Sequence, residues 1–188
     1  MDECQALNQQ FEQIKLDCIS LTGGVDDFEF NWRRESEGWS IAQCVDHLIV
    51  TGRLYLPYVD RAIARAKVQQ QSGRRLHRYG VMERWFLRSL EPPPGPRFRT
   101  PKLFRPARHE LHALETVDVF LALQDDFVSR LRRAQGIDLR RTKVRSPMSP
   151  LIRFSLGIVF ALNAAHARRH LWQIQQMKHA YVQSKRHL

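Results

Sequence analysis

Apolar side chains recur at three- and four-residue intervals over four long segments, and this spacing constrains the fold more than any other feature. In the first segment it joins Leu7, Phe11, Ile14 and Cys18. Residues spaced in this way share one face of an α-helix, which can then be buried. We find no alternation of apolar and polar residues typical of a strand. The sequence therefore predicts an all-α fold.

Breaking and capping residues set the expected limits of the helices. Ser40 and Gln43 have the spacing of a capping box, and Pro57 is expected to kink the helix that follows. Ser149 is a suitable cap for the last helix, with Pro150 in its first turn. The four helices are expected over residues 3–21, 40–71, 109–135 and 149–182.

The link between the second and third helices, residues 72–108, is long for a helix-to-helix connection. Six of the nine prolines lie in residues 91–106 of this link, so that part must be extended or turning. Residues 81–90 read as a short amphipathic helix that packs over the bundle end and buries Trp85, or alternatively lies on a membrane surface. The whole pattern predicts one domain, residues 1–188, forming a four-helix bundle with a long crossover.

Charge is distributed unevenly along the chain. The formal net charge is +11, but residues 1–60 hold four basic and eleven acidic side chains, a net charge of −7. The remaining 128 residues therefore carry +18. This polarity favours acidic partners such as nucleic acid, anionic lipid or a carboxylate-bearing small molecule, or it describes a solvated basic surface. The arginines that form local clusters are Arg74, Arg75, Arg78, Arg132, Arg133, Arg140, Arg141 and Arg145.

Several classes of protein are disfavoured by the composition. The three cysteines lack CxxC spacing, which argues against a disulfide framework and favours a reducing cytoplasm. The acidic N-terminal stretch does not resemble a signal peptide. The longest apolar run, which starts at Phe154, is shorter than the roughly 20 residues that span a bilayer. We therefore expect a cytoplasmic protein without a membrane span.

A polar patch interrupts the buried stripe of the last expected helix. His166 and His170 stand four residues apart, so both imidazoles can reach one ion. Unpartnered buried polar groups cost roughly 1–3 kcal/mol each, so the patch needs a metal, a ligand or a hydrogen-bond network. His47 supplies a third corner if the second and fourth helices are neighbours. The stripe consists of Val159, Asn163, His166, His170, Gln173 and Met177.

Three stretches together resemble the DinB/YfiT-like superfamily. They are FNWRRESEGWSIAQCVDHL, AAHARRHLWQI and TPKLFRP, spread over residues 28–176. The resemblance implies a four-helix bundle with up-down-down-up order and a divalent metal ion bound by His47, His166 and His170. It also implies transferases or isomerases that use low-molecular-weight thiols, and homodimers.

These observations lead to one functional hypothesis and one alternative. The hypothesis is a metal-dependent thiol S-transferase or small-molecule hydrolase, with Zn or Ni as the first choice of ion and Fe or Mn as the second. An ion held by three histidines keeps a position for a thiol or hydroxide. The alternative, ranked lower, is a non-catalytic basic module that binds nucleic acid or another acidic partner.

Further side chains are candidates around the ion, although none stands out as a catalytic acid or base. Gln43, Asn163 and Gln173 are candidates to orient ligands or substrate. Cys44 is either a spare ligand or a small buried residue. Tyr55 and Tyr58 either line the pocket or belong to the core.

Overall fold

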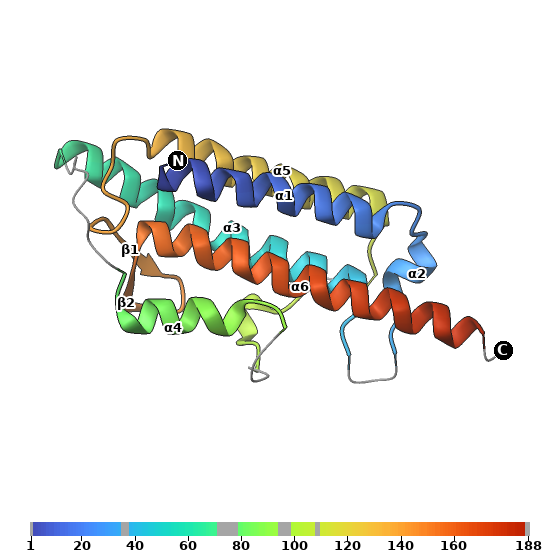
Figure 1. Cartoon of the computed structure of the whole chain (residues 1–188). Helices are drawn as coiled ribbons and strands as arrows, with labels where there is room; N and C mark the ends of the chain where they lie inside the picture. Colours follow the sequence, from blue (N-terminus) through green and yellow to red (C-terminus); the bar gives the residue numbers. More distant parts are fainter. Residues whose placement is uncertain (1, 35–37, 71–78, 94–98, 108–109, 187–188) are drawn as a thin grey trace.

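Four long helices lie alongside one another in the protein (Figure 1). The structure is a computed structural model that describes residues 2–34, 38–70, 79–93, 99–107 and 110–186. The long helices are α1 (Glu3–Thr22), α3 (Ile41–Val68), α5 (Ala113–Arg133) and α6 (Leu156–Lys185). The shorter elements are α2 (Asp27–Asn31), α4 (Val81–Leu90), the 3-10 turn η1 (Lys102–Phe104), and the strands β1 (Lys143–Ser146) and β2 (Ser149–Ser155). The described residues are thus mostly helical, as the apolar spacing predicted.

The packing of the long helices places α3 against α6. Both α1 and α3 contact α5 and α6, so α3 and α6 share an interface across which side chains can meet. The core at the centre is aromatic: the rings of Phe11 and Phe127 stack with centroids 5.2 Å apart, and Phe160 meets both edge-on. All three side chains are almost completely buried, and such ring pairs add to the free energy gained from burial alone.

The capping box at the start of α3 is confirmed. The Ser40 hydroxyl accepts a hydrogen bond from the Gln43 backbone N–H, and the Gln43 amide oxygen accepts one from the Ser40 backbone N–H, each at 3.1 Å. These two bonds satisfy N–H groups that the first helical turn leaves without partners. The cap fixes the start of the helix that carries His47. Pro57 lies inside α3, and its expected kink stays a prediction.

The predicted start of the last helix is wrong. Residues Ser149–Ser155 form β2, which pairs antiparallel with β1, and α6 begins only at Leu156. Backbone carbonyls of the segment between α5 and β1 accept hydrogen bonds from the first N–H groups of α6, with Leu156 bonded to Thr142 at 2.8 Å. Opposite Phe154, Val144 is fully buried in the core. The hairpin therefore closes one end of the bundle, and the expectation of no strand is also wrong.

The crossover contains the expected amphipathic helix, α4, which packs alongside α6 (Figure 1). Phe86 makes the inner contact, stacking on Phe154 of β2 with centroids 6.1 Å apart. Trp85 points the other way and is 62% exposed. Its predicted burial is therefore wrong: neighbouring helix residues diverge by about 100°, and of these two aromatic residues it is Phe86 that contacts the hairpin.

Candidate metal centre

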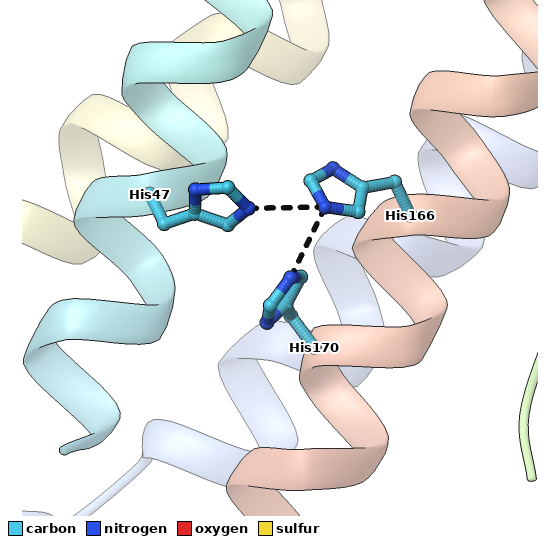
Figure 2. Close-up of side chains that lie close together, drawn as sticks. All are labelled: His47, His166 and His170. Carbon is cyan, nitrogen blue, oxygen red and sulfur yellow. Dashed lines mark hydrogen bonds between the residues drawn. The ribbon is translucent and has the colours of Figure 1, made fainter. Parts of the chain in front are cut away.

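Three histidines from two facing helices converge at the interface of α3 and α6. His47 comes from the second turn of α3, whereas His166 and His170 lie one turn apart on α6. The Nε2 atom of His166 is 3.0 Å from that of His47 and 3.1 Å from that of His170 (Figure 2). Among the described residues, this is the group of histidine, cysteine and acidic side chains suited to hold a metal ion.

A backbone carbonyl outside the two helices fixes the tautomer of His47. The Nδ1 atom of His47 is hydrogen-bonded to the Phe104 carbonyl in η1. Because a carbonyl only accepts, Nδ1 must carry the proton, and in the neutral ring Nε2 then presents a lone pair. That lone pair points at His166 (Figure 2). Orientation of a ligand by a carbonyl bonded to the opposite ring nitrogen is common among metal-binding histidines.

The three nitrogens cannot all satisfy one another through hydrogen bonds. One proton on the Nε2 atom of His166 would have to serve two acceptors, whereas a cation accepts a lone pair from each ring. Zn–N bonds of 2.0–2.1 Å at tetrahedral angles separate the nitrogens by about 3.3 Å. The two spacings to His166 lie within a few tenths of an ångström of this value, and the ligand atoms of all three histidines lie within 4.8 Å of one another. The donor set therefore fits a divalent ion.

Burial keeps the three imidazoles neutral. Burial, and to a lesser extent the nearby His47 and Arg169, lower the pKa of His166 to about 3. The pKa of His170 also falls well below its ordinary value, chiefly because of burial and then because of the other two histidines. Burial lowers the pKa of His47 as well, against opposing effects of the Phe104 carbonyl and Asp46. Neutral imidazole is the form that binds metal.

The segment that carries Phe104 is itself held by α3. The Asp46 carboxylate is buried and accepts a hydrogen bond of 2.6 Å from the Ala107 backbone N–H. The Phe104 ring is buried and stacks on Tyr55, with centroids 6.5 Å apart. Sequence reasoning missed both groups, although TPKLFRP and the Asp46–His47 pair were visible. A carbonyl has no side-chain signal, and Asp46 acts on the loop instead of on the ion.

Trp39 forms a wall beside the histidines, another role that sequence reasoning did not assign. Its ring lies 4.8 Å from that of His47 and stacks on His170 at 5.8 Å between centroids. Trp39 immediately precedes the cap residue Ser40, so the cap that starts α3 also positions this wall. The half-buried indole restricts water on one side of the cluster.

The remaining candidates have mixed positions. Gln43 is used in the helix cap, and the partner of His47 Nδ1 is the Phe104 carbonyl instead. The Asn163 amide donates to the Val159 carbonyl of its own helix at 2.8 Å. Gln173 contacts the cluster: its amide favours protonation of His170, and the Cys44 thiol donates to its oxygen at 3.9 Å.

Cys44 itself is not a reactive thiol. Complete burial raises the pKa of Cys44 to about 12, so this thiol stays protonated.

Comparison with protein families agrees with this architecture. The family model described as DinB superfamily matches residues 10–174. The chain belongs to the DinB superfamily. Neither a search of curated proteins nor a search of solved structures returned a match. The region matched to the DinB superfamily includes all three histidines, Trp39 and Phe104. In the described part of the chain, no helix is long and apolar enough to cross a membrane.

Proposed function

We propose that this DinB-superfamily protein is a metal-dependent enzyme whose His47, His166 and His170 bind one divalent cation. The convergence of three neutral Nε2 atoms at 3.0 and 3.1 Å carries the proposal. Zn or Ni is the proposed ion, with Fe or Mn as the second choice. Imidazole ligands suit Zn, Ni and Fe, whereas Mn prefers oxygen ligands, and metal availability contributes to the selection. The proposal includes the up-down-down-up helix order, which the colours of Figure 1 support: α1 and α6 run one way, α3 and α5 the other.

The protein's own residues prepare the site before any ion arrives. The Phe104 carbonyl holds the His47 ring with its Nε2 lone pair inward, and Asp46 holds the segment that carries this carbonyl. Trp39 covers one side of the rings. A divalent cation bound by three neutral imidazoles keeps its +2 charge and supplies a Lewis-acidic position that lowers the pKa of a thiol or water.

The proposed reaction is transfer of a low-molecular-weight thiol to a small electrophile, or hydrolysis of such an electrophile. The family resemblance favours the thiol. The only cysteine beside the histidines, among the described residues, is Cys44, and its pKa of about 12 leaves it protonated. A nucleophilic thiol would therefore come from a dissolved cosubstrate. A cytoplasmic location and a homodimer complete the proposal.

Metal content is the first test. Tag-free protein, purified without chelator and then reconstituted, should hold about one equivalent of Zn or Ni by mass spectrometry. His47→Ala, His166→Ala and His170→Ala should each lose it. His179→Ala, an exposed histidine farther along α6, is the matched control and should retain it. Less than half an equivalent in the reconstituted wild type, or full occupancy in all three variants, would refute the metal site.

Turnover is the second test. Metal-loaded protein is incubated with 1-chloro-2,4-dinitrobenzene, with and without cysteine or glutathione. Consumption that requires both thiol and metal supports the transferase, and thiol-independent consumption supports the hydrolase. If loaded protein consumes neither this compound nor a panel of activated esters and epoxides, the enzymatic part fails while the metal site stands. The lower-ranked nucleic-acid alternative predicts a gel shift that weakens steeply with salt.

A further inference from the structure

A second cluster of charged side chains lies away from the histidines, at the end of the bundle closed by the hairpin. A cavity of about 280 Å³ opens there between the C-terminal half of α3 and the β1–β2 turn. Three of its lining residues are arginines from two separate elements. The lining consists of Tyr58, Arg61, Arg65, Arg145, Ser146 and Pro147. Tyr58 was a candidate for the metal pocket, but it lines this cavity instead.

The arginines of this cavity differ from several others in the described chain by having no ion-pair partner. Elsewhere, Arg130 and Arg133 share Asp60, Arg140 pairs with Glu3, and Arg168 pairs with Glu91. No described carboxylate forms an ion pair with a cavity arginine. The nearest carboxylate along the chain, on Asp60, is already bound to two arginines of α5. The predicted basic clusters at Arg74, Arg75 and Arg78 lie outside the described residues.

Hydrogen bonds to backbone oxygens orient two of the three guanidinium groups. Arg61 donates from Nε to the Pro57 carbonyl at 3.2 Å and lies over the Tyr58 ring, 4.9 Å from its centroid. Arg65 donates to the Lys143 carbonyl at 3.2 Å. Each of these bonds uses one donor of a group that has five. The remaining donors are available to an oxygen-rich anion.

The hairpin adds a like-charge contact at the same place. Arg145 of β1 stands directly opposite Arg153 of β2. Like charges in directly opposed positions of an antiparallel pair destabilise it. Lys143, on the same strand face, is compensated by Glu83 at 4.0 Å and by the Ser155 hydroxyl at 2.8 Å. For Arg145, an anion in the cavity would supply the missing compensation.

We propose that this cavity binds the phosphate group of a small molecule. A guanidinium group can form two parallel hydrogen bonds to the oxygens of a phosphate. A phosphate offers more acceptor oxygens to three arginines than a single carboxylate does. Tyr58, already stacked with Arg61, gives the site one apolar wall. The cavity is separate from the metal centre, because Tyr58 follows His47 by eleven positions on α3, which is about 16 Å along the axis. The inference therefore goes beyond the proposed enzyme and does not depend on it.

Calorimetric titration of the metal-free full chain with inorganic pyrophosphate at low ionic strength tests the proposal. We expect saturable binding of one equivalent, and a dissociation constant raised at least about tenfold by Arg61→Gln and by Arg145→Gln. Arg145→Lys should restore only part of the affinity, because the charge remains while the fork is lost. Thermal unfolding of each variant checks that it folds.

Two controls make the result specific. Arg186→Gln removes the same charge from an exposed arginine near the C-terminus, at the other end of the molecule (Figure 1), and should change the affinity less than twofold. His166→Ala should bind pyrophosphate as the wild type does, which separates this site from the metal centre. Binding weakened equally by Arg186→Gln, or the absence of saturable binding at millimolar pyrophosphate, would overturn the proposal.

A last comparison identifies the source of the phosphate. Vesicles of phosphatidylglycerol that co-sediment with wild-type protein, but not with Arg61→Gln or Arg145→Gln, would place the phosphate on a lipid headgroup and support the site. The proposal would be contradicted if the vesicles bound wild type and both variants equally and the variants also left the affinity for pyrophosphate unchanged.

Discussion

Removing the His166 imidazole should make the metal-free protein more resistant to acid. In the folded protein, burial and the neighbouring His47 and Arg169 lower the pKa of His166 from 6.5 to about 3. In the unfolded chain the ring recovers its ordinary value near 6.5. Between these two values only the unfolded chain binds the proton. Stability therefore falls as the pH drops below about 6.5.

The size of the effect follows from the two pKa values. At pH 5 the unfolded ring is about one and a half units below its ordinary pKa, so protonation lowers the free energy of the unfolded chain by about 2 kcal/mol. The folded ring gains almost nothing at that pH. The lowered pKa values of His47 and His170 act in the same direction. His166→Leu should therefore remove about 2 kcal/mol of the stability lost between pH 7 and pH 5.

Urea unfolding followed by circular dichroism, in the presence of a chelator, measures this difference. Each protein is compared with itself at the two pH values, so any packing cost of the leucine cancels. His179→Leu on the exposed side of α6 is the control and should lose as much stability as the wild type. An equal loss for His166→Leu and wild type would show that the ring is not buried neutral, and the electrostatic account of the site would be wrong.

Three other substitutions test the surroundings of the site and the core. Gly52→Ala should lower the free energy of unfolding by about 1–3 kcal/mol in urea titrations. The Cβ of the alanine would lie 2.6 Å from Leu123 Cδ2, which is closer than van der Waals contact. Phe160→Ala should lower it by about 3–5 kcal/mol, measured in the same way, since that ring is fully buried. Asp46→Asn should weaken Zn binding about tenfold in competition titrations, because Asp46 holds the segment that orients His47.

The parts of the site that sequence could predict are those encoded by helical spacing. His166 and His170 are four residues apart, so any helix containing both brings their rings together. The cap at Ser40 and Gln43 fixes the start of α3. The inclusion of His47 needed tertiary information, namely that α3 faces α6, which the family resemblance supplied and helical periodicity could not.

The errors share a physical cause, which is competition between local signals and tertiary contacts. Ser149 and Pro150 are favoured at a helix start, yet the strand they belong to pairs with β1 and closes the bundle end. The five-residue helix α2, capped by Asp26, lies between the first two expected helices and is too short to give a periodic signal. The exposure of Trp85 likewise depends on which side of α4 meets the hairpin.

The crossover explains why a proline-rich link belongs to the metal centre. Helices supply side chains, but their backbone carbonyls are already used within the helix, so a carbonyl for His47 must come from non-helical chain or a helix end. The proline-rich segment itself supplies it: Pro101 precedes the turn η1, which ends at Phe104. Asp46, adjacent to His47, holds the next part of the same segment through Ala107. Two consecutive residues of α3 thus have separate roles. His47 faces the histidines of α6, and Asp46 holds the segment whose carbonyl orients the His47 ring.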